Sequence, residues 1–367
     1  MPAYDALFAP LPFKGLTLPN RIVMAPMTRS YSPAQVPGED VAGYYRRRAE
    51  GGVGLIITEG TTLRDQASTF DGRVPKIDGE PSLEGWARVV EAVHGAGGLI
   101  MPQLWHVGAV RRAERTDHPN VTSKSPSGLF RPGKAQGEAM DRGTIEDTIS
   151  DYARAAADAR RVGFDGVEIH AAHGYLIDQF FWEGTNQRDD LYGGGLIERT
   201  RFAQDVVRAV RAATGPDYPI ILRFSQWKQQ DYTAKLAQTP DELGAFLAVL
   251  AEAGVDAFHC STRRYWEPEF EGSDLNLAGW AKTLTGLPSI TVGSIGLDTD
   301  FITTYGDTPG SAPSRIDDLV ARLERGEFDL AAVGRALIAN PDWPRMVRDG
   351  DMAGLKAYTK DLLGALD

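Results

Sequence analysis

The chain has 367 residues, of which 42% are hydrophobic and 24% charged, a composition in the ordinary range of folded globular proteins. The 39 basic and 50 acidic residues give a net charge of −11, and the arginines are scattered, which argues against a nucleic-acid partner. The single cysteine, Cys260, excludes an internal disulfide and any metal cluster built from several cysteines of one chain.

The sequence predicts neither a membrane span nor a secretory signal. No stretch approaches the roughly 18 consecutive apolar residues that a span requires. The opening MPAYDALFAPLPFKGLTLPN lacks a basic start, and prolines interrupt its apolar residues. We therefore expect a cytoplasmic protein, as a monomer or a homodimer.

Short runs rich in Val, Ile and Leu alternate with longer stretches of helical period, as in parallel sheets covered by helices. Eight runs occur, at residues 21–26, 53–60, 98–106, 165–170, 219–225, 255–261, 289–294 and 328–334. Eight strand-helix units predict an α/β fold, a (β/α)₈ TIM barrel forming one domain over residues 1–367. A doubly wound open sheet is the alternative.

Helix boundaries between these runs have recognisable signals. Thr144 and Thr239 stand where helices are expected to begin, and each is followed by an acidic residue three positions later. Gly163 and Gly254 stand where those helices are expected to end.

Two segments interrupt the alternation of strands and helices. Residues 107–143 are rich in Pro, Gly and charged residues and follow the third expected strand, so they predict a long excursion or lid. Residues 297–314 predict a second loop insertion, after the seventh strand.

Polar and aromatic residues close the apolar runs, at the strand ends where a TIM barrel builds its site. Taken one at a time, each is equally well explained as a buried polar group with a hydrogen-bond partner. The residues concerned are Pro26, Met27, Thr28, Glu59, Gly60, Gln103, Trp105, His106, His170, His173, Tyr175, Arg223, Gly293, Ser294, Gly334 and Arg335.

Gly293-Ser294 and Gly334-Arg335 end the seventh and eighth runs. Barrels often bind phosphate with the loops after these two strands, because glycine lets backbone N–H groups approach the anion. A glycine that simply ends a strand is the alternative for each pair. Together, the two pairs favour a phosphorylated cofactor or substrate, with Arg335 adding a fixed positive charge.

His170 and His173 have three interpretations: metal ligands, core histidines or substrate donors. A zinc site requires three or four protein ligands, whereas Thr28, Gln103 and Arg223 stand at other strand ends, which argues against a metal. Two histidines three residues apart, followed by Tyr175, form a donor cluster suited to an oxygen or nitrogen of a substrate.

Arg223 follows apolar residues, and a buried guanidinium without a partner is very costly, so an anion is expected beside it. Gln103 offers a donor and an acceptor, which suits the imide edge of a heterocycle. The phosphate positions, the amide and the arginine together predict a planar heterocyclic phosphate such as FMN.

The chain resembles the Old Yellow Enzyme family of FMN-dependent NAD(P)H oxidoreductases, or ene-reductases. The resemblance runs along nearly the whole chain, in the segments NRIVMAPMTRS (20–30), ITEGT, PQLWHVG, EIHAAHGYLIDQFFWEGTNQRDDLYGG (168–194) and AAVGRALIANPDWP (332–344). The segment 168–194 is highly specific.

The resemblance implies contacts of several residues with FMN, bound non-covalently, and NADPH or NADH as hydride donor. Pro26, Met27 and Thr28 would run beside the flavin ring, and Gly60, Gln103 and Arg223 would meet its pyrimidine side. Phosphate binding would fall to Gly293, Ser294, Gly334 and Arg335.

The resemblance also implies the reaction. His170 and His173 would grip the carbonyl or nitro oxygen of an activated alkene, flavin N5 would deliver hydride to the β carbon, and Tyr175 would protonate the α carbon, in ping-pong order. Nitro compounds and nitrate esters are further candidate substrates. Trp105, Tyr265 and Trp266 would shape the substrate pocket, with ordinary surface packing as the alternative for Tyr265 and Trp266.

One departure from the family concerns the end of the chain. It lacks the aromatic, glycine-rich C-terminal segment that many relatives place near the dimethylbenzene edge of the flavin, and Trp343 is a candidate to cover that edge. Two alternatives of other classes stay open: a metal-dependent barrel hydrolase using His170 and His173, and a flavin-binding protein without turnover.

Overall fold

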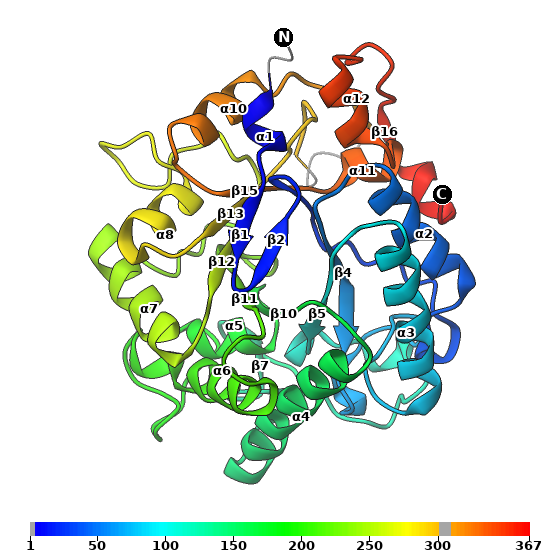
Figure 1. The fold of residues 1–367 in the computed structure, drawn as a ribbon. Helices are drawn as coiled ribbons and strands as arrows, with labels where there is room; N and C mark the ends of the chain where they lie inside the picture. Colours follow the sequence, from blue (N-terminus) through cyan, green and yellow to red (C-terminus); the bar gives the residue numbers. More distant parts are fainter. Residues whose placement is uncertain (1–3, 301–309) are drawn as a thin grey trace.

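The computed structural model describes residues 4–300 and 310–367. Parallel strands close into a barrel, in the order β10-β11-β12-β13-β15-β3-β4-β5 (Figure 1). Its strands are β3 (Ile22–Met24), β4 (Leu55–Thr62), β5 (Ile100–Trp105), β10 (Val167–His173), β11 (Ile220–Lys228), β12 (Ala257–Ser261), β13 (Ser289–Val292) and β15 (Leu330–Val333). Each strand lies within or overlaps one expected run. Closure by pairing of β15 with β3 confirms the TIM barrel and rules out an open sheet.

Helices surround the barrel (Figure 1). They are α2 (Glu39–Glu50), α3 (Glu80–Gly95), α4 (Arg142–Arg161), α5 (Leu176–Phe181), α6 (Arg201–Thr214), α7 (Pro240–Ala253), α8 (Leu277–Thr285), α10 (Asp317–Glu324), α11 (Arg335–Ala339) and α12 (Trp343–Asp349). A short helix, α1 (Asp5–Phe8), precedes the barrel.

The helix boundaries agree with the sequence at three of four positions. Thr239 caps α7 by accepting a hydrogen bond from the Glu242 amide, and Gly254 ends it with a φ of 119°. Gly163 follows α4, with a φ of 101°. The predicted start at Thr144 is wrong, because Asp141 caps α4 by accepting the Thr144 amide.

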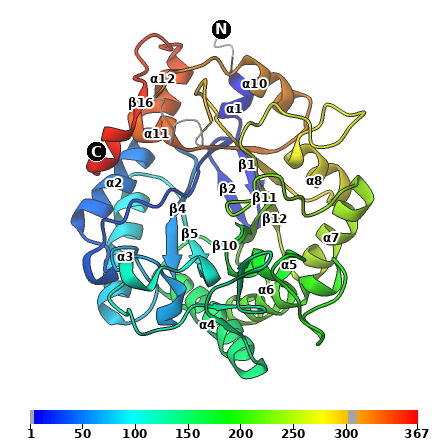
Figure 2. The same ribbon diagram turned by 180° about the vertical axis from the view of Figure 1, so that it is seen from behind.

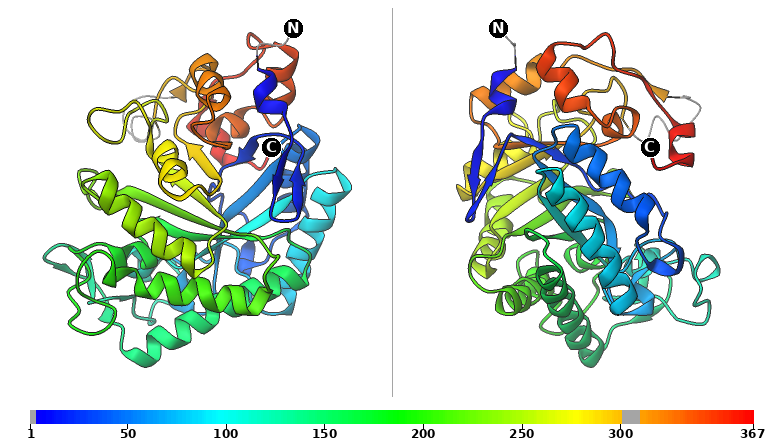
Figure 3. Two further views of the ribbon diagram at one scale, coloured as in Figure 1. Left: turned by 60° about the vertical axis from the view of Figure 1, so that its left-hand side comes forward. Right: turned by 45° about the vertical axis from the view of Figure 1, so that its right-hand side comes forward.

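The barrel has two layers of apolar side chains, inside the sheet and between the sheet and the helices. Alternation along each strand separates them: Val23 and Ile57 belong to the inner cluster, whereas Met24 and Ile56 pack outward among the helices. Phe13 and Leu18, in β1 (Leu11–Phe13) and β2 (Leu16–Leu18), join the inner cluster. This hairpin therefore seals one end of the barrel (Figure 3), and the other end remains for a site.

The excursion after β5 has structure of its own. It contains the hairpin of β7 (Leu129–Arg131) and β8 (Lys134–Ala135), and a second pair of strands, β6 (Lys124–Ser125) and β9 (Glu138–Ala139).

In the second insertion, residues 301–309 lie outside the described residues. Within the part of the chain that is described, no helix is long and apolar enough to cross a membrane.

The C-terminal segment lies beside α2 (Figure 2). Arg29 Nη2 donates to the Ala365 carbonyl oxygen at 2.5 Å, and Arg47 and Arg48 donate to the carbonyls of Leu366 and Asp367. β16 (Tyr358–Thr359) in the same segment pairs with β14 (Gly310–Ser311). These contacts fix the end of the chain against the barrel.

Candidate active site

A cavity of about 570 Å³ lies at the carboxyl ends of the barrel strands. Most of the predicted site residues line it, namely Pro26, Met27, Thr28, Gln103, Trp105, His170, His173, Tyr175, Arg223, Gly293, Ser294, Gly334 and Arg335. They come from strands far apart in the sequence, so closure of the barrel is what brings them together.

The end of β10 brings three rings into one cluster. His173 and Gly174 both have left-handed backbone, with φ of 65° and 78°, and this turn redirects the chain before Tyr175. The ring centroid of His170 lies 5.1 Å from those of both His173 and Tyr175, and Trp105 lies 4.9 Å from Tyr175. A side chain at position 174 would meet Gln230, which explains the glycine.

Both histidines are neutral at physiological pH. Burial, reinforced by the charge of Arg223, holds the pKa of His170 and of His173 well below the ordinary value of 6.5. His170 Nδ1 accepts the Ala172 amide at 3.3 Å, so the ring proton of neutral His170 is on Nε2. Within the described residues, no group of three or more His, Cys, Asp or Glu is placed to hold a metal ion.

Ser261 connects His173 with Arg223. Its Oγ lies 2.7 Å from His173 Nε2 and accepts a longer hydrogen bond, of 3.4 Å, from Arg223 Nη2. Trp227 stacks on the His173 ring at 4.6 Å and donates to the Ser261 carbonyl. The histidine is therefore held from two sides.

Arg223 is buried and faces the cavity, and its Nε has no hydrogen-bond acceptor among the described residues. Burial lowers its pKa, although Glu168 opposes that shift. A cation in this position is stabilised by an anion in the cavity.

Sequence reasoning missed a buried pair behind Gln103. Glu168 Oε2 lies 2.6 Å from His259 Nδ1, and Glu168 Oε1 accepts the Gln103 amide nitrogen at 2.8 Å. The Gln103 amide is thereby oriented by a fully buried carboxylate. The sequence contains a signal for this buried pair. Glu168 and His259 are ionisable residues in the middle of the apolar runs DGVEIH and VDAFHCS, where a charged group requires a partner.

The ends of β13 and β15 form another wall of the cavity. Gly293 and Ser294 have φ of 149° and 53°, and a side chain at position 293 would meet Thr262 and the Arg264 amide at under 3.0 Å. Arg335 Nη2 donates to the Thr299 carbonyl at 2.7 Å. Glycine thus allows two backbone segments to approach closely here.

The C-terminal segment contributes residues that sequence reasoning did not place in the site. Tyr358, Lys360 and Leu363 line the cavity, and the guanidinium carbon of Arg335 lies 5.6 Å from the centre of the Tyr358 ring. The segment therefore supplies an aromatic residue, Tyr358, to the cavity wall. The position of the segment follows from hydrogen bonds with Arg29, with α2 and with β14.

Several expected residues lie elsewhere. Gly60 is absent from the cavity wall, because Trp105 packs directly on it, within 2.2 Å of where a Cβ would be. Tyr265 and Trp266 pack on each other at 5.2 Å and do not line the cavity. Trp343 is buried beside Gly296 and does not line it either.

Glu59 supports the loop after β3 at Arg29 and Ser30. Its carboxylate accepts both of their amides, at 2.9 and 3.0 Å, and burial raises the pKa of Glu59 from 4.5 to about 7. The folded state therefore binds a proton more tightly than the unfolded state, and stability falls as pH rises from 4.5 towards 7.

Glu59→Gln keeps the accepting oxygen and removes this titration. Between pH 4.5 and 7.5, the wild type should lose up to about 3 kcal/mol of unfolding free energy relative to the variant. The variant should therefore compare more favourably with the wild type at the higher pH. Urea unfolding at several pH values measures it, and a difference independent of pH would contradict the assignment.

The residues present fit FMN. The unpartnered Nε of the buried Arg223 suits an electron-rich ring edge, and the oriented Gln103 amide suits an imide. The cavity wall formed by Gly293, Ser294, Gly334 and Arg335 suits a phosphate, because it combines glycine backbone with a guanidinium.

Comparison with known proteins agrees with this chemistry. Residues 6–352 match the NADH:flavin oxidoreductase / NADH oxidase family. Putative 12-oxophytodienoate reductase-like protein 1 of Arabidopsis thaliana is 34% identical over 342 residues, which cover 90% of this chain and 97% of that protein.

Solved structures give the same result. Morphinone reductase in complex with tetrahydroNAD superposes with a TM-score of 0.83 at 30% identity, covering 98% of this chain and 96% of that one. The old yellow enzyme homologue from Zymomonas mobilis gives a TM-score of 0.81 at 29% identity, covering 98% of both chains. The chain belongs to the NADH:flavin oxidoreductase / NADH oxidase family and is an NAD(P)H-dependent flavin oxidoreductase of the Old Yellow Enzyme type.

Proposed function

We propose that this flavin oxidoreductase is an ene-reductase that reduces the C=C bond of α,β-unsaturated carbonyl or nitro compounds. The observation that carries the proposal is the cluster of His170, His173 and Tyr175 on one wall of a cavity that also holds Arg223. Two similar proteins are named as a putative 12-oxophytodienoate reductase-like protein and as morphinone reductase, and these names of reductases support the proposal.

The histidines would bind and polarise the substrate. A neutral imidazole donates one N–H, and His170 has its proton on Nε2 because Nδ1 is an acceptor. Donation to the carbonyl or nitro oxygen draws electron density from the conjugated C=C and stabilises the negative charge that develops on the oxygen. Ser261 and Trp227 hold His173 in place for the same task.

Tyr175 would supply the proton for the α carbon. Its Oη accepts a hydrogen bond from Gln229 Nε2 at 3.1 Å, so the hydroxyl hydrogen points away from Gln229. A tyrosine positioned in this way acts as a general acid, an effect worth about 10²–10⁴-fold in rate.

The remaining wall residues would hold the cofactor. Arg223 and Gln103 would bind the pyrimidine side, and Gly293, Ser294, Gly334 and Arg335 the phosphate. Bound FMN would supply the hydride chemistry between NAD(P)H and the β carbon. FMN would bind non-covalently. A bond to cysteine is not expected, because Cys260 is fully buried outside the cavity.

Product analysis tests the proposal. Enzyme reconstituted with FMN and supplied with NADPH is expected to convert 2-cyclohexenone to cyclohexanone, with one NADPH consumed for each molecule formed. Formation of the allylic alcohol, or NADPH oxidation coupled only to oxygen, would contradict ene-reduction. Replacement of 2-cyclohexenone by cyclohexanone is the control, because the product has no C=C bond to reduce.

A further inference from the structure

The two histidines of the ring cluster leave different ring nitrogens to the active-site cavity. His170 Nδ1 accepts the Ala172 amide at 3.3 Å, which leaves Nε2 for the cavity. In His173 the occupied nitrogen is Nε2, because Ser261 Oγ lies 2.7 Å from it. Nδ1 of His173 has no hydrogen-bond partner among residues 4–300 and 310–367, so it is the nitrogen available to a ligand in the cavity.

Ser261 Oγ has one hydrogen to donate, and its surroundings offer one acceptor. A guanidinium can only donate, and Arg223 Nη2 donates to Oγ at 3.4 Å. Within the described residues, His173 Nε2 is the other partner of this oxygen. If Nε2 carried the ring proton, the hydroxyl hydrogen would lack an acceptor in a side chain that is 3% exposed, which is costly. The arrangement without this cost has the hydroxyl donating to Nε2.

The charge of Arg223 favours the same arrangement. His173 is neutral, because burial and then the Arg223 charge hold its pKa well below 6.5. A neutral imidazole has one N–H and one lone pair, and a cation stabilises the lone pair on the side that it faces. Since His173 Nε2 and Arg223 Nη2 meet at one oxygen, the lone pair belongs on Nε2 and the proton on Nδ1.

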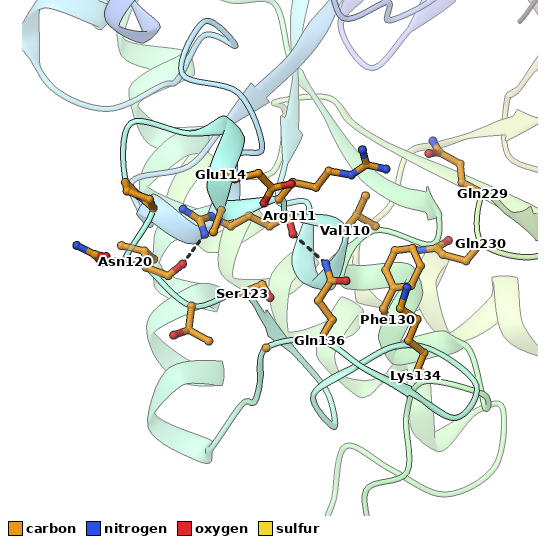
Figure 4. A pocket seen from close by; sticks show the side chains of 16 residues that line it. Val110, Arg111, Glu114, Asn120, Ser123, Phe130, Lys134, Gln136, Gln229 and Gln230 are labelled. Atoms are coloured by element: carbon orange, nitrogen blue, oxygen red, sulfur yellow. Dashed lines mark hydrogen bonds between the residues drawn. The ribbon is translucent and has the colours of Figure 1, made fainter.

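Other contacts fix the position of His173 and leave its tautomer open. Ser225 Oγ accepts the His173 amide at 2.9 Å. The carbonyl of the next residue, Gly174, accepts Gln230 Nε2 at 2.8 Å, from the wall of a second cavity of about 810 Å³ (Figure 4). Both contacts are made by the backbone, so Ser261 is the residue that distinguishes one ring nitrogen from the other.

We propose that Ser261 is a positioning residue that fixes the tautomer of His173, so that His173 Nδ1–H and His170 Nε2–H both face the cavity as donors. The inference rests on the proposed function, because it names the residue that prepares His173 to bind the oxygen of the alkene. In the other tautomer, His173 would turn a lone pair towards that oxygen and repel it. One of the two donors that stabilise the developing negative charge would then be lost.

Removal of the hydroxyl in Ser261→Ala should slow reoxidation of the reduced enzyme by 2-cyclohexenone about tenfold or more, because part of the enzyme then lacks the second donor. Ser261→Thr keeps a hydroxyl and should restore most of the rate. Ser225→Ala is the matched control, since it removes a hydroxyl that binds the His173 backbone and leaves the ring nitrogens unchanged. Its reoxidation should stay close to that of the wild type.

Long-range ¹H–¹⁵N correlation spectra of the FMN-reconstituted protein, labelled with ¹⁵N-histidine, test the inference without turnover. The chain has six histidines, and the variant His173→Asn identifies the signals of His173. We expect a protonated Nδ1 and a bare Nε2 in the wild type, in Ser225→Ala and in Ser261→Thr. In Ser261→Ala, a measurable share of His173 should carry its proton on Nε2.

A proton on Nε2 in the wild type overturns the inference, and so does a tautomer that is unchanged in Ser261→Ala. A changed tautomer with an unchanged rate of reoxidation also overturns it, as does an equal loss of rate in Ser225→Ala. If the wild type reduces no alkene, the proposed function fails, whereas the spectra still decide whether Ser261 fixes the tautomer.

Discussion

Tyr175→Phe is expected to slow reoxidation of the reduced enzyme by 2-cyclohexenone about 10²-fold or more, and to leave its reduction by NADPH unchanged. The substitution removes the hydroxyl that accepts from Gln229 and keeps the ring that packs on Trp105 and His170. Anaerobic stopped-flow absorbance measures the two half-reactions separately.

Tyr265→Phe is the control for this experiment. It removes a hydroxyl from a tyrosine that the sequence placed in the substrate pocket and the structure places outside it. Both half-reactions should keep their wild-type rates. Equal losses in both half-reactions of Tyr175→Phe would mean that Tyr175 shapes the cavity and is not the proton donor.

Lys228→Met is expected to lower the free energy of unfolding by about 3–5 kcal/mol. Lys228 and Asp178 form an ion pair at 2.6 Å, and both side chains are fully buried behind the active site. The other oxygen of Asp178 accepts the Gly174 amide at 2.7 Å, so the pair supports the turn that precedes Tyr175. Removal of the lysine leaves a buried carboxylate without its cation.

The double variant Asp178→Asn/Lys228→Met tests the cause of that loss. Asparagine keeps an oxygen for the Gly174 amide and removes the charge, so most of the lost stability should return. Arg142→Met provides the comparison with an exposed pair, because Arg142 and Glu146 are more than half exposed and such pairs contribute little to stability. Urea unfolding in which Lys228→Met behaves like Arg142→Met would show that the buried pair is unimportant.

The barrel was predictable because each strand falls on a short run of mostly apolar residues that the fold buries on both sides. Ile22, Val23 and Met24 illustrate this, since the barrel core takes the middle residue and the helices cover the other two. Most site residues followed from the same pattern, because parallel strands present their carboxyl ends to one cavity.

The remaining parts of the site depend on contacts between segments far apart in the sequence. Tyr358 reaches the cavity because Arg29, Arg47 and Arg48 bind the C-terminal carbonyls, and no local pattern encodes such bonds. Tyr265 was misplaced for a related reason: an aromatic residue after a strand packs on whatever neighbour the loop supplies, here Trp266.

Residue type did not separate structural from functional roles either. Gly60 matches a motif of the family, yet the structure explains it by the Trp105 ring that packs on it. Glu168 lies within an apolar run and was passed over, although it orients Gln103. Burial and hydrogen-bond partners decide such cases, and both require the fold.

The visible absorption spectrum under anaerobic conditions tests the central claim most directly. Protein reconstituted with FMN should show a flavin band that bleaches on addition of NADPH and recovers when 2-cyclohexenone is added. A protein that does not retain FMN would contradict the roles of Gln103, Arg223 and Arg335. A flavin that bleaches with NADPH and does not recover with the enone would contradict ene-reduction.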